Sequence, residues 1–234
     1  MSTQLRQIVG ELEAMADPQC VAGLARYGVR PKKILGISIT KLMEIEKRTG
    51  KNHDLAIELW RTGIHDARLL ACLIDDPRRV TEAQMEKWVR DFDSWVICDG
   101  CCGHLFDRTP FAYQKADEWS RRKEEYVKRA GFVLMACLAV HDKKADDEVF
   151  LEFLQMIRRG SNDERNYVRK AVNWALRTIG KRNLRLHAEA IKTGERIRKL
   201  DSKAAKWIAS DALRELRSEE VMSRLKKRRL KSLH

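Results

Sequence analysis

The chain has 234 residues and a formal charge of +13, from 47 Lys and Arg against 34 Asp and Glu. This length can bury a sizeable core in one domain or in one continuous array of repeats. No stretch approaches the ~20 apolar residues that a membrane-spanning helix needs, and the start Met1–Arg6 lacks the apolar core of a secretory signal. We therefore expect no membrane partner and a cytoplasmic location.

Apolar residues recur at helical spacing along nearly the whole chain, and no segment shows the alternation typical of a strand. Prolines, glycines and capping residues divide this pattern into segments. We expect helices over 2–15, 18–27, 39–50, 53–62, 65–75, 81–92, 94–106, 110–121, 123–140, 146–159, 164–180, 183–198, 201–216 and 218–230. The short links between them favour antiparallel neighbours.

An internal repeat turns these helices into an architecture. The pentapeptide 126–130, Tyr-Val-Lys-Arg-Ala, recurs 41 residues later at 167–171 as Tyr-Val-Arg-Lys-Ala, and 66–71 and 204–209 are looser copies. A period near 40 made of two helices is typical of HEAT or armadillo stacking. We therefore predict an all-α fold, a curved α-solenoid of antiparallel helix pairs, with a single domain over 1–234.

The positive charge is not spread evenly. Residues 1–117 hold 17 basic and 17 acidic side chains, whereas 118–234 hold 30 basic and 17 acidic ones. A one-sided basic surface attracts polyanions, of which nucleic acid is one. If equivalent repeat positions face the same way, a concave groove carries Lys128, Arg129, Arg169 and Lys170. The basic C-terminal segment 223–234 either extends a DNA footprint or is a flexible, solvated tail.

The six cysteines lie inside predicted helices and are typical of buried, reduced thiols. They are Cys20, Cys72, Cys98, Cys101, Cys102 and Cys137. Cys98, Cys101, Cys102 and His104 are potential soft ligands, but a structural zinc site normally needs a second ligand pair, which the sequence lacks. We expect no disulfide, no metal and no cofactor.

An indole and a carboxylate lie four residues apart at Trp95 and Asp99, so on a helix they share one face. A carboxylate on an apolar, Cys-rich turn is costly unless it meets a cation. We expect Arg129 and Trp174 to come to the same place, which predicts a site for a positively charged substrate. Taken singly, the tryptophans could be core aromatics and Arg129 an ion-pair partner between repeats. The remaining tryptophans are assigned to packing or to the groove rim: Trp60, Trp88, Trp119 and Trp207.

These residues resemble the AlkD family of DNA glycosylases, which are built from HEAT-like repeats and remove alkylated purines. The resemblance covers almost the whole chain. It rests on Ser-Trp-x-x-x-Asp ending at Asp99, on Lys-Arg-Ala around Arg129, and on Arg-Lys-Ala-x-x-Trp-Ala-Leu-Arg around Trp174. A further match, Ala-Arg-Tyr ending at Tyr27, resembles the N-terminal part of the family, where an aromatic residue lies near the damaged base pair.

The resemblance implies that Asp99 is the catalytic carboxylate, that Trp95 and Trp174 contact the deoxyribose, and that Arg129 binds a phosphate beside the lesion. The expected function is a DNA glycosylase of base excision repair, acting as a monomer on double-stranded DNA that contains alkylated purines such as 3-methyladenine or 7-methylguanine. Because no lysine lies on the turn of Trp95 and Asp99, the enzyme should be a monofunctional hydrolase. A second hypothesis is a non-catalytic HEAT-repeat scaffold that binds nucleic acid or an acidic protein through the same basic groove.

Overall fold

The structure is a computed structural model that describes residues 2–231. The regular elements of these residues are fourteen α-helices and one short 3-10 helix, and none is a strand. Each predicted helix is present, with its ends within a few residues of the expected ones. The 3-10 turn η1 was not predicted, because three residues are too few to show a hydrophobic period.

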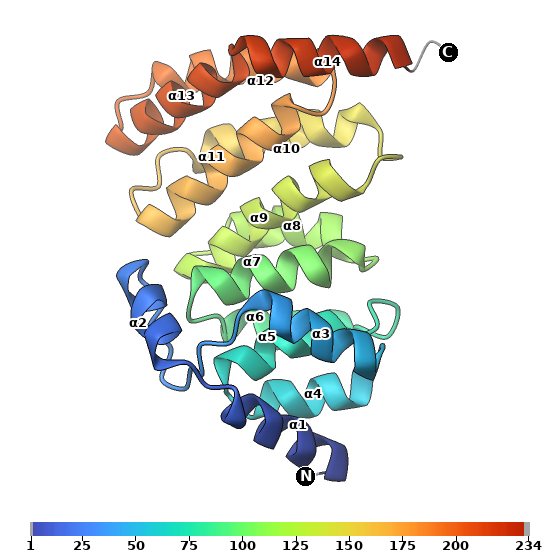
Figure 1. Cartoon of the computed structure of the whole chain (residues 1–234). Helices are drawn as coiled ribbons and strands as arrows, with labels where there is room; N and C mark the ends of the chain where they lie inside the picture. Colours follow the sequence, from blue (N-terminus) through green and yellow to red (C-terminus); the bar gives the residue numbers. More distant parts are fainter. Residues whose placement is uncertain (1, 232–234) are drawn as a thin grey trace. The chain divides into compact units, whose positions relative to one another are not determined.

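The first compact unit extends to Phe111 (Figure 1). It contains α1 (Thr3–Ala14), α2 (Pro18–Arg26), α3 (Ile39–Thr49), α4 (His53–Arg61), α5 (His65–Ile74), α6 (Glu82–Arg90), α7 (Trp95–His104) and η1 (Phe106–Arg108). Helix α5 is central and packs against α3, α4 and α7. Trp60 on α4 stacks on Trp88 on α6, with ring centroids 3.9 Å apart and an interplanar angle of 3°. Both rings are buried, so the packing assignment is confirmed for these two tryptophans.

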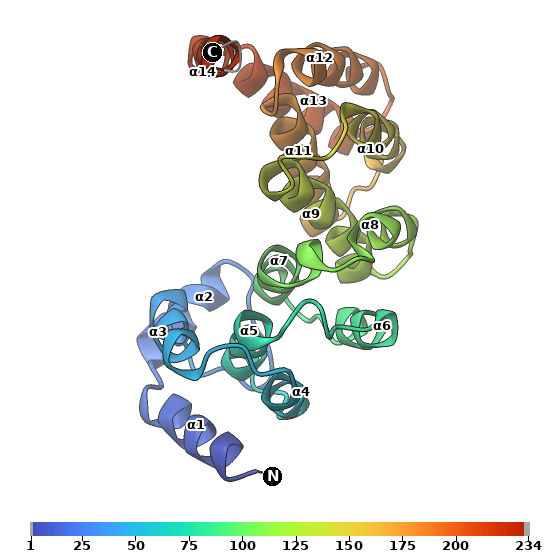
Figure 2. The same cartoon turned by 90° about the vertical axis from the view of Figure 1, so that its right-hand side faces the viewer.

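The second compact unit starts at Ala112. It contains α8 (Ala112–Ser120), α9 (Glu125–His141), α10 (Asp147–Gly160), α11 (Asn166–Gly180), α12 (Leu184–Arg198), α13 (Lys203–Leu216) and α14 (Glu219–Lys231). Helices α9, α11 and α13 lie side by side in one layer, and α8, α10 and α12 form the other (Figure 2). Helix α14 packs against α12 and α13. The expectation of one continuous domain over 1–234 stays a prediction.

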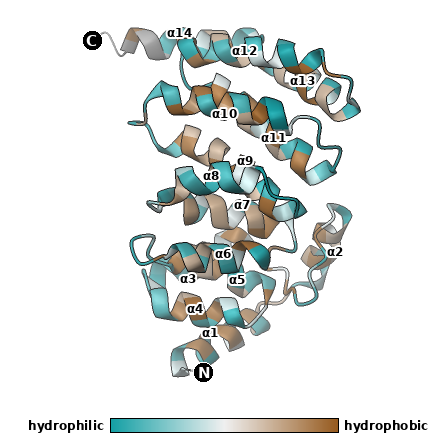
Figure 3. Ribbon diagram, turned by 180° about the vertical axis from the view of Figure 1, so that it is seen from behind, coloured by the Kyte–Doolittle hydropathy of each residue, from teal (hydrophilic) through white to brown (hydrophobic). Residues whose placement is uncertain are grey.

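Local sequence explains where these helices begin. Side-chain oxygens accept hydrogen bonds from backbone N–H groups of the first helical turn. Such caps are formed by Ser2, Asp17, Ser38, Asn52, Thr81, Ser94, Asn183 and Ser202. Most helices carry both hydrophobic and hydrophilic residues, as in α1, α4 and α10 (Figure 3). The hydrophobic side of such a helix can be buried against its neighbours.

The predicted basic segment 223–234 is described only in part. It continues α14 as far as Lys231, and Leu225 is buried on that helix. Residues 232–234 lie outside the described residues, as do the side chains of Arg228, Arg229 and Lys231.

Candidate functional site

Helix α7 places Trp95 and Asp99 on one face. The buried Ser94 accepts a hydrogen bond at its Oγ from the backbone N–H of Ile97 at 3.3 Å, so the helix begins at Trp95. Trp95 and Asp99 are both half-buried. Four other residues of the helix are fully buried: Ile97, Cys98, Cys101 and Cys102. The partly exposed face therefore presents an indole and a carboxylate one turn apart.

A second predicted residue lies beside Trp95. The indole Nε1–H of Trp95 donates a hydrogen bond to the backbone carbonyl of Tyr27 at 3.1 Å. Tyr27 ends α2, and its side chain is 73% exposed. Gly28 follows with φ of 80°, a left-handed conformation that favours glycine and turns the chain away from the helix. The structure thus brings together the N-terminal aromatic and the first tryptophan of the predicted site.

The cysteines around Asp99 are packing groups. Cys101 on α7 is fully buried, and this burial raises the pKa of its thiol. All six cysteines lie in the described part of the chain, and none of them forms a disulfide there. Across residues 2–231, no three His, Cys, Asp or Glu side chains are grouped so that they could hold a metal ion. The turn that carries Asp99 is therefore backed by buried cysteine side chains.

Arg129 lies in the second unit, on α9, and is only 5% exposed. Its Nη1 donates a hydrogen bond to the backbone carbonyl of Tyr167 at 2.6 Å, at the start of α11. The rings of Tyr126 and Tyr167, on the same two helices, stack with centroids 5.7 Å apart. Phosphate binding by Arg129 stays a prediction.

The other basic residues of the repeat differ in their surroundings. Lys128 Nζ lies 2.9 Å from Asp163 Oδ2, and Arg165 also holds this carboxylate through two hydrogen bonds of 2.9 and 2.6 Å. The guanidinium of Arg169 lies over the ring of Trp207, 5.0 Å from its centroid. Lys170 is exposed.

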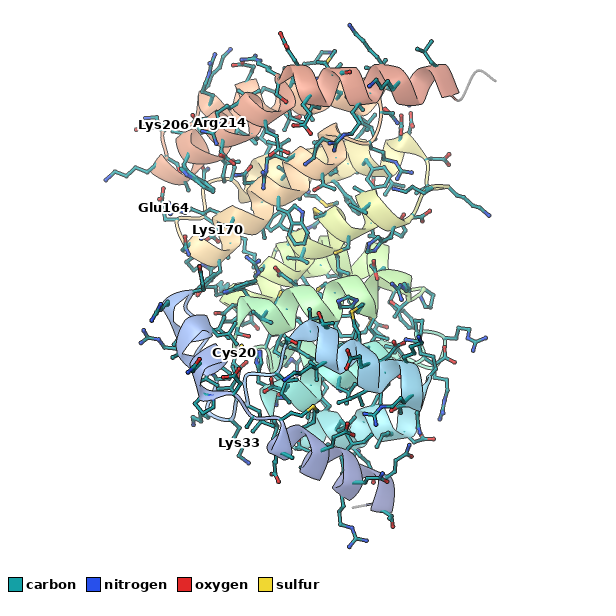
Figure 4. All side chains as sticks on the ribbon, in the orientation of Figure 1. Cys20, Lys33, Glu164, Lys170, Lys206 and Arg214 are labelled. Atoms are coloured by element: carbon teal, nitrogen blue, oxygen red, sulfur yellow. The ribbon has the colours of Figure 1, made fainter. Side chains whose placement is uncertain are left out.

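The repeat register is visible in the helices themselves. Lys128, Arg169 and Lys206 occupy the fourth positions of α9, α11 and α13, so Lys206 belongs to a basic row although it was not among the expected groove residues. Lys170 and Lys206 lie near the amino-terminal ends of these neighbouring helices (Figure 4). The fifth positions are less alike, because Arg129 is buried whereas Lys170 is exposed. The looser copy at 204–209 was the signal that could have identified Lys206.

Trp174, on α11, is half-buried and lines a cavity of about 670 Å³ within the second unit. The other walls come from the end of α9, the segment after it, the α11–α12 turn and α14. Taken singly, Trp174 could have been a core aromatic, and the structure shows that it is not fully buried. Trp119, which was assigned to packing or to the groove rim, is fully buried. The expectation that Trp95, Asp99, Arg129 and Trp174 meet in one place stays a prediction.

With this geometry, comparison with known proteins identifies the family. The sequence model of the DNA alkylation repair enzyme family matches residues 8–217. The chain belongs to this family. One relative is an uncharacterized protein of Listeria innocua that is 25% identical over 198 residues. The match covers 83% of this chain and 86% of the relative's chain. An uncharacterized protein of Listeria monocytogenes is 24% identical with the same coverage.

A solved structure gives the fold independently. It comes from a family described as new, related to the HEAT-like repeat DNA glycosylases and with affinity for branched DNA structures. The match has a TM-score of 0.75 at 20% identity and covers 90% of this chain and 94% of that chain. The fold of helix pairs expected from the internal repeat is confirmed as that of the HEAT-like repeat DNA glycosylases and their relatives.

No helix among residues 2–231 combines the length and apolar character needed to cross a bilayer.

Proposed function

We propose that this member of the DNA alkylation repair family is a glycosylase that hydrolyses the N-glycosidic bond of cationic alkylated purines in duplex DNA. The observation that carries the proposal is the shared face of α7, where the Asp99 carboxylate and the Trp95 indole are both half-buried one turn apart. Family membership gives this pair its context.

The chemistry of such a substrate needs little from the protein. A purine alkylated on a ring nitrogen is already cationic, so it leaves as a neutral base without the general acid that ordinary glycoside cleavage requires. Positive charge then develops on the sugar. Asp99 stabilises that charge and orients water, and the faces of Trp95 and Trp174 add cation–π attraction of roughly 0.5 to 2 kcal/mol each.

The remaining residues bind the nucleic acid. Arg129 holds a phosphate beside the lesion, and Lys128, Arg169 and Lys170 attract the backbone. Tyr27 presents its exposed ring to DNA close to Trp95. The sequence of α7 contains no lysine that could form a Schiff base, so the proposed enzyme is monofunctional and releases the base without cutting the strand.

The test is release of free base from methylated duplex DNA by the wild-type protein and by Asp99→Asn, with binding to the same DNA measured in parallel. Wild type should release the base, and Asp99→Asn should lose release by a hundredfold or more, on the order of other electrostatic stabilisers, while keeping its DNA affinity. Asp17→Asn is a control, because this carboxylate caps α2 at the surface. Absence of release by wild type, with DNA binding intact, would contradict the catalytic proposal.

A second candidate is a non-catalytic protein that binds DNA through its basic side chains. The solved relative with affinity for branched DNA structures favours this alternative. Under it, neither the wild type nor Asp99→Asn would release a base, and Asp99→Asn would leave DNA binding unchanged or strengthen it by removing a negative charge. The same assay therefore distinguishes the two candidates.

A further inference from the structure

The segment that leaves α2 concentrates the positive charge of the first unit. Residues 26–33, here called the basic turn, hold four of the 16 basic side chains of that unit and none of its 16 acidic ones. The four are Arg26, Arg30, Lys32 and Lys33, and all of them are exposed (Figure 4 labels Lys33). Like charges so close together repel one another, so the cluster favours an anionic partner.

The cations of the basic turn have no acidic partner in the described part of the chain. None of the four forms an ion pair within residues 2–231. Other exposed arginines of the same unit do form such pairs, as Arg79 does with Asp54, where Nη2 lies 3.0 Å from Oδ1. Arg30 donates one hydrogen bond from Nε to the carbonyl of Ala25 at 3.4 Å, which helps to cap α2. The charge of the turn is therefore available to a ligand.

The backbone of the basic turn is held at both of its ends. The carbonyl of Tyr27 accepts the hydrogen bond from the indole of Trp95 at 3.1 Å, and the carbonyl of Lys33 accepts one from the backbone N–H of His65 at 2.8 Å. Between them, Val29 is buried. The turn is thus preformed, which reduces the entropy that binding would cost.

Asp66, the second residue of α5, fixes the segment that follows the turn. Its carboxylate is buried and accepts hydrogen bonds from the backbone N–H groups of Leu35 and Ile37, each at 2.7 Å. Gly36 lies between these two residues, and a Cβ built there would be 2.5 Å from the backbone O of Asp17, the cap of α2. The segment therefore ties the basic turn to α5 and to the start of α2.

We propose that the basic turn binds backbone phosphates of the DNA strand beside the face of Trp95 and Asp99. This contact surface belongs to the first unit and is separate from the basic residues of α9 and α11. The hydrogen bond between Trp95 and Tyr27 joins the turn directly to that face, so a strand lying over the face comes within reach of the long cationic side chains. A DNA strand carries a phosphate on every nucleotide, so one occupant can meet several cations. The inference rests on the proposal that DNA is the substrate, but it concerns binding and not base release.

The experiment measures fluorescence anisotropy of a labelled undamaged duplex at several salt concentrations. The double variant Lys32→Gln with Lys33→Gln should bind about tenfold more weakly, and the slope of log K against log salt should fall by about two, one for each lost phosphate contact. Neither side chain forms a hydrogen bond or an ion pair within residues 2–231, so the fold should be unaffected. The double variant Lys32→Arg with Lys33→Arg should keep most of the affinity, because both charges remain.

The matched control is the double variant Lys47→Gln with Lys87→Gln. Both lysines are exposed on helices of the same unit, on α3 and α6, and neither forms an ion pair within the described residues. The control removes the same charge from the same unit, so its loss should stay within about twofold, the long-range effect of net charge.

Equal losses in the turn variant and the control would overturn the inference, as would a turn variant that binds like the wild type. Because this assay involves no chemistry, it separates the inference from the proposed function. Base release that depends on Asp99 can persist when the turn variant binds normally, and the turn can bind phosphate in a protein that releases no base.

Discussion

At Gly131, helix α9 lies close to the backbone of α8. A Cβ built at this residue would lie 2.4 Å from the backbone N of Ser120, and the obstacle is backbone that cannot rotate away. Gly131→Ala should therefore destabilise the protein by about 1–3 kcal/mol, the usual cost of overpacking. The measurement is the free energy of unfolding in urea.

Gly10→Ala is the opposite case and the control. Gly10 lies within α1, and a Cβ there would meet nothing within 4 Å. Alanine loses less conformational entropy on folding, so this variant should be more stable by about 0.5–1 kcal/mol. Destabilisation of similar size in both variants would show that the contact with Ser120 is not the cause.

Asp163 makes the stability of the protein depend on pH. Burial raises its pKa, but the hydrogen bonds from Arg165 and Lys128 outweigh burial and hold the pKa well below the ordinary value of 3.8. At pH values between the lowered pKa of the folded protein and 3.8, the Asp163 carboxylate binds a proton in the unfolded chain but not in the folded protein. Acid therefore favours unfolding. Stability should fall as the pH drops below about 3.8, and Asp163→Asn should show a smaller fall. Thermal unfolding between pH 2 and 5 measures both, and parallel curves would contradict this coupling.

At the scale of a single helix, Ser94 decides how α7 presents its functional face. It is fully buried and caps the helix at the residue before Trp95. Ser94→Ala should cost about 1 kcal/mol of stability, because the first turn loses its acceptor. The fraying should also displace Trp95, so base release at saturating DNA should fall severalfold.

Ser38→Ala provides the comparison for this helix start. Ser38 caps α3 in the same way but is exposed and precedes no proposed site residue. The Ser38→Ala variant should lose as much stability as Ser94→Ala or less, and it should keep full base release. Equal loss of activity in both variants would mean that stability, and not the position of Trp95, controls the rate.

At the scale of the molecule, the charge separates by unit. The chain up to residue 111 holds 16 basic and 16 acidic side chains, and the remainder holds 31 and 18. If the second unit contacts six or more phosphates, DNA affinity should fall roughly a thousandfold or more between 50 and 200 mM salt. Anisotropy titrations measure this slope, and an affinity that does not depend on salt would contradict the basic surface as the binding site.

Two lysines test where that slope originates. Lys170 on α11 and Lys47 on α3 are both exposed, one in each unit. Lys170→Gln should weaken DNA binding and reduce the salt slope, whereas Lys47→Gln should leave both nearly unchanged. A larger effect at Lys47 would place the DNA-binding surface in the first unit.

The sequence by itself determined the helices and the position of Trp95 and Asp99 on one helix face. Helix starts are fixed by contacts within one turn, such as that of Ser94 with Ile97, which are local in the chain. Two residues four positions apart share a face wherever the helix is placed. The 41-residue repeat likewise fixed the helix-pair fold, since equivalent segments form equivalent helices.

Only the tertiary structure decided which basic and aromatic side chains are accessible. Arg129 and Lys170 occupy equivalent repeat positions, yet Arg129 is buried on the carbonyl of Tyr167 and Lys170 is exposed. Trp174 has a helical core pattern but lines a cavity to which Arg224 is brought from α14. Burial depends on the neighbouring helices and on the long-range contacts they make. Arg129 and Tyr167 are 38 positions apart in the chain, and Trp174 and Arg224, which line the same cavity, are 50 apart. No periodicity within a single helix encodes such neighbours.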